Sequence, residues 1–538
     1  MLKSLGLAAA VALAGAPWGM AQATNQAPSA VPSPAGHPAP ASARAIDINE
    51  YRVEGSERLA QGDLEAALEP FLGPGRTLED VERARAALEK TYSDKGFQSV
   101  SVAIPPQTVR DGVVTLKVTE GKVGRLRVRG SRYFSLRDIE RQAPSVAEGE
   151  VPNFDHIVRD VVALNQLPDR RVTPALRAGA VPGTVDVDLN VQDTLPLHGS
   201  LEVNNRYSSD TTHARLAGSL HYDNLWQLGH SLTFSFQVAP KRVQDGKVFS
   251  ASYLARFPAV QWLTLTLSGV LQNSEVSTLG SIGVKGKGRI VGGRASFTLP
   301  GTPGFFHTVS AGVDYKHFDE GITLGEDALE TPITYWPFTL QYGATWPGES
   351  SQTQAGVTVV ANLRGLSSGT GEFDAKRYKA SGSFIYYRAE VSRTDEVRGV
   401  QLFERVHGQY SGDPLIGSEQ FTAGGAETVR GYAEVQGAGD YGAVGTFELR
   451  GPSLAKWFGK PVLNEWRFLA FVEGGRLVVR DALPDQKSFS RLLSAGGGSR
   501  VRLLDHLSGS VDVGVPLVSE GGTRRYHPRV HFRLCSEF

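Results

Sequence analysis

The sequence has almost no cysteine: Cys535 is the single one in 538 residues. This excludes an intrachain disulfide and a zinc site built from cysteines. Long apolar runs are also missing, since no stretch of the mature chain approaches the roughly 18 residues of a membrane-spanning helix. Neither charge sign is in excess, because Lys+Arg and Asp+Glu are 56 each. That balance argues against a nucleic-acid binder that relies on overall basicity.

The N-terminus has the three parts of a secretory signal. Lys3 supplies the positive charge, Leu5–Ala14 the apolar core, and Ala21-Gln22-Ala23 the small-x-small cleavage site. A membrane anchor is the alternative, but the apolar core is short for one. Residues 1–23 are therefore predicted to be a signal peptide. Residues 24–45, rich in Pro, Ala and Ser, are predicted to be an extended linker.

Two copies of one small domain are predicted after the linker. Arg52–Ser56 (RVEGS) returns as Arg127–Ser131 (RVRGS), 75 positions later (127 − 52), and Asp63-Leu64 returns at the same spacing as Asp138-Ile139. A repeat at a fixed period indicates a repeated structural unit. The copies are expected to span residues 46–121 and 122–195.

Each copy is predicted to run strand, helix, helix, strand, strand. Thr77 and Asp80 form a capping-box pattern at the start of one helix. Strands are expected over Val100–Ile104 and Val113–Glu120, and over the alternating Val185, Val187, Leu189 and Val191. Three sets of apolar residues follow helical spacing. One helical face is expected from Leu64, Ala67, Leu68 and Phe71, an inward-facing set from Leu78, Val81, Leu88 and Tyr92, and a helical stripe from Phe154, Ile157, Val158 and Val161.

From Pro196 to the C-terminus the pattern changes to alternating segments separated by Gly, Asp, Asn and Pro. Val511, Val513 and Val515, for example, alternate with Ser510, Asp512 and Gly514. The last segment places Val530, Phe532 and Leu534 on one face and His531 and Arg533 on the other. The set Leu263, Leu265 and Leu267 alternates with polar residues in the same way. Roughly ten-residue segments of this kind, about sixteen in number, are typical of an outer-membrane barrel. A soluble β-sandwich is the alternative. The number of segments, the charges on the polar face and the last aromatic residue argue against it.

One Gly-rich segment interrupts these strands. Ser418–Asp440 contains five glycines and the tetrapeptide Val429-Arg430-Gly431-Tyr432, without clean alternation. Long inserts between strands are mostly functional, and glycine allows close backbone approach. We expect this segment to fold back into the barrel and to hold Arg430 there.

These features together resemble the Omp85 superfamily, and in particular its two-partner-secretion transporters, the haemolysin and filamentous-haemagglutinin exporters. The resemblance implies a 16-stranded antiparallel membrane β-barrel at residues 196–538, preceded by two α+β POTRA domains. It identifies the Gly-rich segment as loop six, at about residues 412–440. The matching motifs are Val429-Arg430-Gly431-Tyr432, Ser418-Glu419-Gln420-Phe421, Gly424-Gly425, Gly439-Asp440 and Glu448-Leu449-Arg450.

In that family the loop arginine contacts a Phe-x-Asp-x-Gly motif on the barrel wall. The matching residues here are Phe471, Glu473 and Gly475, which share one strand face. Glu473 replaces the usual aspartate; it keeps the charge but is one methylene longer, which loosens the fork expected with Arg430. The contact could serve transport or only folding. The last residue, Phe538, resembles the C-terminal assembly signal of outer-membrane proteins.

The resemblance implies an outer-membrane pore that exports a partner exoprotein, with the POTRA domains in the periplasm capturing the unfolded partner. Expected partners are a large secreted β-helical exoprotein, outer-membrane lipid and the barrel-assembly machinery, without nucleic acid. A barrel-assembly insertase of the same superfamily and a passive porin are the alternatives. Some family members begin with a helix that plugs the barrel; the proline-rich residues 24–45 do not predict one.

No catalytic or metal site and no cofactor are expected. Gly365-Leu366-Ser367-Ser368-Gly369 matches the nucleophile-elbow pattern, which requires a helix after it. A turn and another strand are expected there instead, which leaves a surface loop. A membrane-embedded hydrolase would need Ser367. The twelve histidines are scattered, without helical metal-ligand spacing.

Overall fold

The computed structural model describes residues 45–209, 211–257, 260–279, 282–302, 304–319, 321–324, 327–330, 332–363, 365–458, 462–484 and 486–538. The predicted signal peptide, the linker up to residue 44 and the question of a plug helix lie outside these residues. The chain divides into two compact units, of which one ends at Leu195 and the other begins at Pro196. No helix of the described part is long and apolar enough to cross a bilayer.

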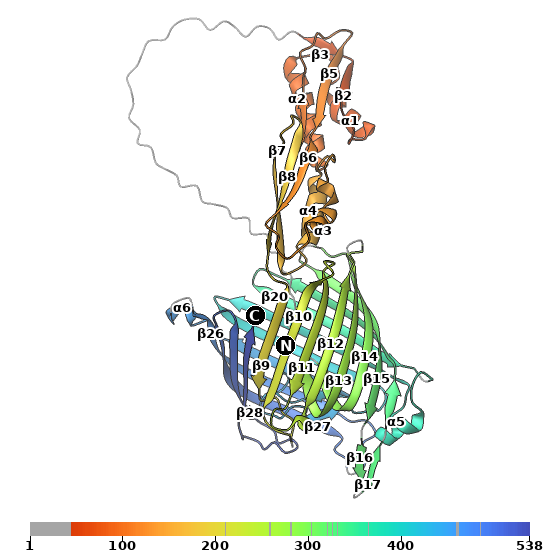
Figure 1. Cartoon of the computed structure of the whole chain (residues 1–538), viewed down its shortest axis with the longest axis vertical. Coiled ribbons are helices and arrows are strands. Elements are labelled where there is room, and N and C mark those ends of the chain that lie inside the picture. The colour runs from red at the N-terminus through yellow and green to blue at the C-terminus, as the bar shows by residue number, and fades with distance from the viewer. Residues whose placement is uncertain are drawn as a thin grey trace. The chain divides into compact units, whose positions relative to one another are not determined.

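The first unit is α+β, as predicted, and contains two three-stranded sheets (Figure 1). In each sheet the first strand pairs in parallel with a central strand, which also pairs antiparallel with a third. The elements are β1 (Ile46–Ile48), β2 (Glu50–Glu54), α1 (Gln61–Leu68), η1 (Glu69–Phe71), β3 (Gly73–Arg76), α2 (Leu78–Asp94), β4 (Val100–Ala103), β5 (Val113–Glu120), β6 (Lys122–Arg129), α3 (Leu136–Arg141), η2 (Pro144–Val146), α4 (Phe154–Leu164), β7 (Arg170–Ala178) and β8 (Thr184–Asp193).

The two copies repeat the same local chemistry. Gly55 and Gly130 both have a positive φ, of 85° and 87°. A Cβ at either position would collide with a carbonyl oxygen of the central strand, which explains the glycine at both. The turn after each glycine is held by a carboxylate, because Glu120 accepts from two backbone N–H groups in the first copy and Asp193 does so in the second.

The predicted capping box begins α2: Thr77 N–H donates to the Asp80 carboxylate at 2.8 Å. This hydrogen bond lowers the pKa of Asp80. The prediction that Leu78 faces inward was wrong, since Leu78 is 73% exposed, and Val158 of the predicted helical stripe is 59% exposed. Leu78 is the first residue of α2, where a side chain leans out past the helix end. Val158 is rotated by about 100° from the buried Ile157.

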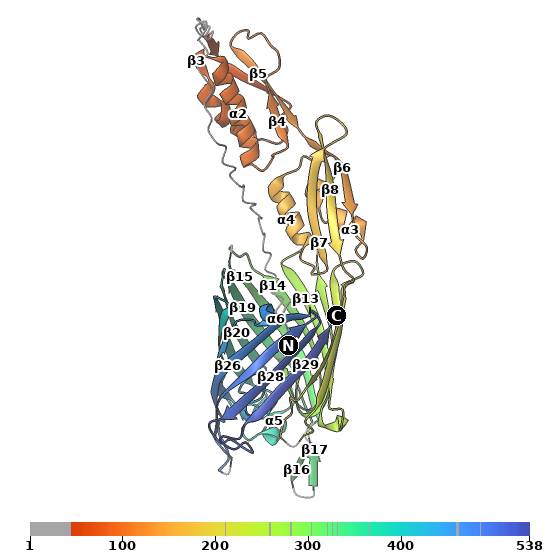
Figure 2. The ribbon, with the colours of Figure 1, turned by 90° about the vertical axis from the view of Figure 1, so that its left-hand side faces the viewer.

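The second unit is a closed antiparallel barrel, as predicted (Figure 1, Figure 2). Its described residues form sixteen strands when β18 and β19, which both pair with β15 on either side of Trp336, are counted as one. The strands are β9 (Leu197–Asn204), β10 (Arg215–Leu225), β11 (His230–Val238), β12 (Lys247–Arg256), β13 (Leu263–Leu279), β14 (Ile282–Thr298), β15 (Phe306–Asp319), β18 (Ile333–Tyr335), β19 (Pro337–Pro347), β20 (Ser351–Asn362), β21 (Phe384–Val397), β22 (Val400–Ser411), β25 (Tyr441–Arg450), β26 (Leu463–Val478), β27 (Phe489–Leu503), β28 (Leu507–Pro516) and β29 (Arg529–Glu537).

Short elements connect the barrel strands, and β9 pairs with β29 to close the cylinder. The connecting elements are η3 (Val243–Asp245), β16 (Gly321–Leu324), β17 (Asp327–Glu330), α5 (Thr370–Lys376), β23 (Phe421–Ala423), β24 (Gly437–Gly439) and α6 (Ala455–Phe458).

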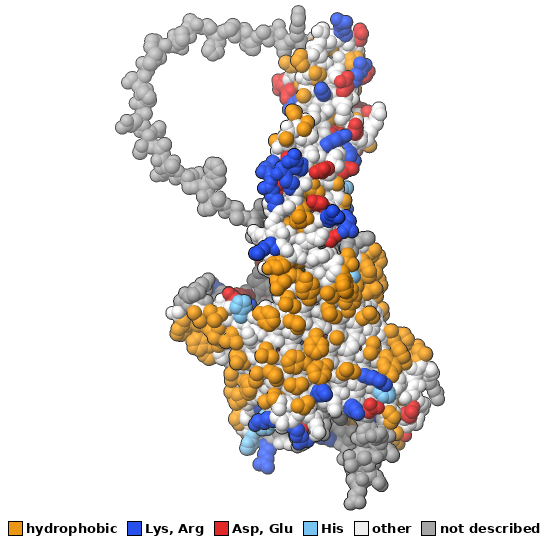
Figure 3. All heavy atoms as spheres, in the orientation of Figure 1, with side chains coloured by type: hydrophobic (Ala, Val, Ile, Leu, Met, Phe, Trp, Pro, Cys, Tyr) orange, Lys and Arg blue, Asp and Glu red, His pale blue; other side chains and the backbone are white. Residues whose placement is uncertain are grey.

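Alternation along the strands gives the barrel an apolar outer wall. On β26, Phe468 and Val472 are exposed, whereas Phe471 and Glu473 are buried. On β28, Val511 and Val513 are exposed on the outside, whereas Asp512 between them is buried. Apolar side chains accordingly spread over the barrel surface in Figure 3. A lipid-facing apolar band around a polar interior is the arrangement of outer-membrane barrels.

The segment around Ser367 differs from the prediction. A helix, α5, follows it instead of a strand, because the Glu372 carboxylate accepts from Gly369 N–H at 2.6 Å and caps the helix. The Ser367 hydroxyl accepts from the Asn362 side-chain amide at 2.7 Å. This contact holds the turn after β20, so the serine has a structural role.

Candidate functional site

Loop 6, residues 412–440, connects β22 to β25 and lies inside the barrel. Part of it forms a small hairpin, in which β23 pairs antiparallel with β24. Along each wall strand, the residues that contact the tip alternate with residues that are exposed on the outer face. Glu448, for example, contacts Arg430 and lies between the exposed Phe447 and Leu449. The tip is therefore held by the lumen side of the wall.

Arg430 and Glu473 form a buried pair, with 3% exposure for each residue. Glu473 Oε1 accepts from Arg430 Nε at 3.0 Å and from Nη2 at 2.7 Å, while Oε2 accepts from the Arg430 backbone N–H at 2.6 Å. One carboxylate thus binds both the guanidinium and the main chain. The glutamate at this position therefore does form a tight contact with Arg430.

Two further carboxylates surround the same guanidinium. Arg430 Nη2 lies 2.6 Å from Glu448 Oε2, and Nη1 lies 3.5 Å from Asp512 Oδ1. Arg450 Nε lies 2.6 Å from the other Glu448 oxygen, Oε1, and Arg500 Nη1 lies 2.7 Å from the same Asp512 oxygen, Oδ1. Three arginines and three carboxylates therefore balance one another, as buried charges require.

The Phe471 ring completes the site by lying under the guanidinium, whose central carbon is 3.5 Å from the ring centroid. Such a cation–π contact adds to the charge pairs, most strongly where water is excluded. A Cβ at Gly496 would collide with this ring, so the glycine leaves room for Phe471.

The backbone of the tip packs directly on the backbone of β28. Gly431 has φ +95°, and a Cβ added at Gly514 would lie 2.5 Å from Gly431 N and 2.6 Å from Arg430 C. Gly431 N–H donates to His531 Nε2 at 3.1 Å. Glycine on both surfaces is therefore needed for the tip to reach the wall.

The neighbours of Arg430 attach the tip through apolar packing. Val429 and Tyr432 are both fully buried, in a cluster that also contains Phe421, Ala423, Val444, Leu477 and Leu492. The Tyr432 hydroxyl lies 2.7 Å from Val518 O and accepts from Leu493 N–H at 3.2 Å. The four residues of the sequence motif thus use different interactions to dock the same tip.

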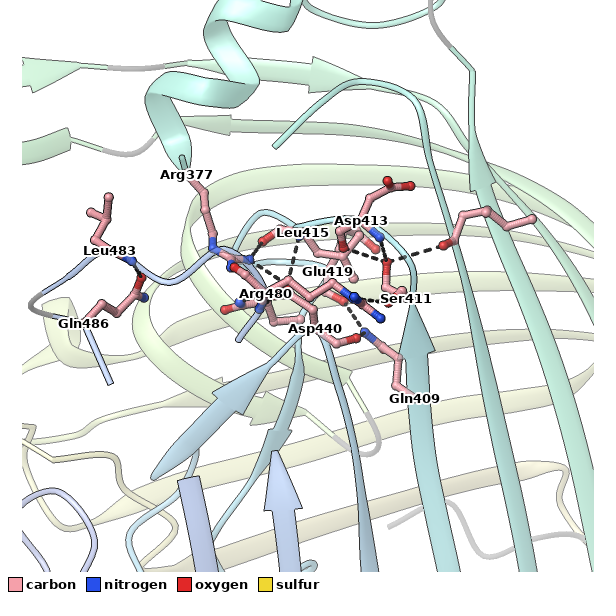
Figure 4. Close-up of polar contacts among 12 residues, drawn as sticks. Arg377, Gln409, Ser411, Asp413, Leu415, Glu419, Asp440, Arg480, Leu483 and Gln486 are labelled. Atoms are coloured by element: carbon pink, nitrogen blue, oxygen red, sulfur yellow. Dashed lines mark hydrogen bonds and ion pairs between the residues drawn. The ribbon is translucent and has the colours of Figure 1, made fainter. Parts of the chain in front are cut away.

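Asp440 anchors the C-terminal end of loop 6 (Figure 4). Arg377, just after α5, forms a fork with its two carboxylate oxygens at 2.6 and 2.9 Å. The backbone N–H groups of Leu415 and Arg480 donate to the same carboxylate at 2.9 and 2.7 Å. This single side chain therefore joins both ends of the loop to the segment after α5 and to the connection after β26.

Glu419 anchors the N-terminal part of the loop. Lys316 Nζ lies 2.7 Å from Oε1, and the hydroxyls of Tyr335 and Tyr386 donate to the two oxygens at 2.6 and 2.8 Å. These partners belong to β15, β18 and β21 on the lumen wall. Loop 6 is thus fixed at its tip and at both ends.

The structure brings the predicted site residues together to different degrees. Arg430, Glu473 and Phe471 are in direct contact. Gly475 faces Val444 on β25 instead of the loop. Phe538 lies at the closing seam, where it exchanges two backbone hydrogen bonds with Gly199, each of 3.0 Å.

The sequence did not identify several residues that contact loop 6. Asp512, His531 and Arg377 belong to no recognised motif. The first two lie on the polar faces of predicted strands, which marks them only as lumen-facing. Glu448 lay within a matched motif but was not predicted to contact Arg430.

Comparison with known proteins agrees with this architecture. Residues 46–121 match the POTRA domain of ShlB type, and residues 183–501 match the haemolysin secretion/activation protein family ShlB/FhaC/HecB. The chain is 24% identical over 466 residues to the outer membrane transporter CdiB of Dickeya dadantii, which covers 80% of this chain and 76% of that protein. It is 20% identical over 391 residues to the heme/hemopexin transporter protein HuxB of Haemophilus influenzae, over 70% of this chain and 67% of that protein.

Solved structures share the fold. CdiB from Escherichia coli superposes with a TM-score of 0.65 at 20% identity, over 92% of this chain and 91% of that chain. BamA from Haemophilus ducreyi, lacking POTRA domains 1–3, gives a TM-score of 0.54 at 14% identity, over 92% of this chain and all of that chain. The family match covers more than half of the chain. The protein therefore belongs to the haemolysin secretion/activation family ShlB/FhaC/HecB and is a two-partner-secretion transporter of the outer membrane, with its POTRA region in the periplasm.

Proposed function

We propose that loop 6 is a removable plug, and that the partner exoprotein crosses the lumen once the loop tip has left the wall. The observation that carries this proposal is the docked tip itself, which occupies the lumen through Arg430, Glu473, Glu448 and Asp512. Val429 to Tyr432 act as the docking motif, and Phe471 and Glu473 as its receptor. All contacts that hold the docked tip on the wall are non-covalent, so they can be broken when the tip leaves the wall.

Before this step, the first unit, which ends at Leu195, captures the unfolded partner. We assign residues 46–121 and 122–195 to two POTRA domains, whose outer strands are β2 and β4 in the first and β6 and β7 in the second. An extended segment can pair with an outer strand through backbone hydrogen bonds, which tolerate varied sequence. The exoprotein then reaches the surface, where its folding biases the direction of transport. Phe538 serves as the assembly signal for the barrel.

Deletion of the gene separates this function from the two alternatives. We expect the loss of one large protein from the culture supernatant while the other outer-membrane proteins remain at their normal levels. A general decrease in barrel proteins would indicate an insertase. Unchanged supernatant and membranes would indicate a porin. Mass spectrometry of both fractions provides the measurement.

A disulfide between the loop and the wall tests the plug. A Cβ built on Gly437 of β24 lies 3.0 Å from the Ser490 Cβ of β27. This is about 0.5 Å below the lower end of the roughly 3.5–4.5 Å range of a disulfide, so a small backbone shift would allow the bond. In a Cys535→Ala background, the double variant Gly437→Cys/Ser490→Cys should secrete little when oxidised. Secretion should recover after addition of a reductant.

The two single-cysteine variants are the matched controls, because each carries one substitution without the cross-link. Both should secrete equally with and without reductant. If the oxidised double variant secretes as well as the reduced one, loop 6 stays docked during transport and the plug proposal is wrong. The family membership of the protein would be unaffected by that result.

A further inference from the structure

Two histidines and an aspartate meet on the first two strands of the barrel. His198 of β9 pairs directly with His221 of β10, and Asp223 follows two residues later on the same face. The two imidazole rings stack with centroids 4.9 Å apart and an interplanar angle of 28°. His221 Nε2 lies 3.4 Å from Asp223 Oδ2. One nitrogen or oxygen atom from each residue lies within 4.8 Å of the others.

These three side chains face the lumen. Leu201 and Val203 are exposed on the outer wall of β9, and His198 has the opposite parity. The same argument places His221 and Asp223 inside, since Leu220 is exposed on the outer wall of β10. The lumen is the polar side of the barrel, so hydrated ions can reach the three residues.

The surroundings keep Asp223 in place and leave the three residues accessible. The Asp223 backbone N–H donates to Pro196 O at 2.9 Å. Arg256 is the nearby cation that would compete with an ion. Its Nη1, however, is directed to Gly229 O at 2.7 Å and to Ser231 Oγ at 3.1 Å. All three candidate ligands are only partly buried, which allows the rings to rotate.

We propose that His198, His221 and Asp223 bind a divalent transition metal, best fitted by Zn²⁺, at the lumen rim where the chain enters the barrel. Two imidazoles and one carboxylate are a common zinc donor set, with a fourth position left for water. Zinc bonds of about 2.0–2.2 Å require ligand atoms about 3.4 Å apart, so small side-chain rotations would close the site. The sequence did not reveal it, because cross-strand pairing and not helical spacing brings the histidines together.

A bound ion would fasten β9 to β10 beside the closing seam. His198 precedes Gly199, whose backbone exchanges hydrogen bonds with Phe538 across the seam. A bound zinc ion would therefore restrain the first residues of β9, the strand that closes the barrel by pairing with β29. A ligand that binds only the folded state also raises the unfolding midpoint as its concentration rises.

Calorimetric titration of the detergent-purified full-length protein with ZnCl₂ tests the proposal. We expect one zinc per chain, a rise in the thermal unfolding midpoint with zinc, and ligand-field absorption when Co²⁺ replaces zinc. All three signals should disappear in His198→Asn and in His221→Gln. The control His317→Asn should keep them; it changes a histidine on the outer face of β15 that also pairs with an aspartate, Asp319, at 3.1 Å.

Heat-modifiable migration on a gel shows whether each variant is folded. Asp223→Asn provides a further ligand variant, expected to bind zinc more weakly, if a histidine variant fails to fold. Binding that persists in the folded ligand variants, or that is lost equally in His317→Asn, would overturn the site. A wild-type protein that takes up no zinc and gives no Co²⁺ absorption would overturn it as well.

Discussion

Arg430→Ala is expected to abolish most secretion while leaving the barrel folded in the outer membrane. The substitution leaves three carboxylates of the lumen without their shared guanidinium. Removing one partner of a buried ion pair costs about 3–5 kcal/mol. This corresponds to docking that is weaker on the order of a hundredfold to several thousandfold. In the proposed cycle the tip leaves the wall only while the partner passes and then docks again. A tip that cannot dock again stays unfixed in the lumen and obstructs the passage.

The barrel should survive this change because the wall strands keep their ladder hydrogen bonds and the anchors at Glu419 and Asp440 remain. Immunoblots of the supernatant and heat-modifiability of the membrane fraction measure the two effects. Arg393→Ala is the matched control. It removes an exposed pair with Asp395 on β21, and such pairs contribute only about 0–1 kcal/mol. Normal secretion by Arg430→Ala would show that the arginine has no part in transport.

Gly514→Ala is expected to displace the loop tip without changing any charge. The added methyl carbon would lie 2.5–2.6 Å from backbone atoms of Gly431 and Arg430. Real Cβ contacts are longer than this, and neither backbone can rotate away as a side chain can. The tip must therefore leave β28, and the Arg430 contacts are lost with it. Secretion should fall about as far as in Arg430→Ala.

Limited proteolysis of intact outer membranes measures the displacement directly, because an undocked loop 6 should be cleaved faster. Gly445→Ala provides the control, since a Cβ at that position on β25 has no atom within 4 Å. It should leave both proteolysis and secretion unchanged. Equal behaviour of the two alanine variants would contradict the close backbone contact between the tip and the wall.

The zinc site illustrates how strand register limits prediction. His198 and His221 are 23 positions apart (221 − 198), and neither belongs to a recognisable motif. They become neighbours only because β9 and β10 pair in one register, since a slip of one residue would turn either side chain to the other face of the wall. The same is true of Asp512 and His531, whose polar faces were predicted but whose meeting with loop 6 was not.

The sequence alone determined the features that depend on local pattern. The repeat of RVEGS, the alternation of each strand and the motif around Arg430 are set by residues close together in the chain, and period two assigns each strand residue to the wall or to the lumen. Only the tertiary structure decided which side chains from different strands meet one another and loop 6 inside the lumen. Glu448, Glu473 and Asp512 come from three separate strands, and only closure of the barrel places them around one guanidinium. Closure also decided that Asp440 meets Arg377, because side chains far apart in sequence are brought together by strand register and barrel curvature and not by local spacing.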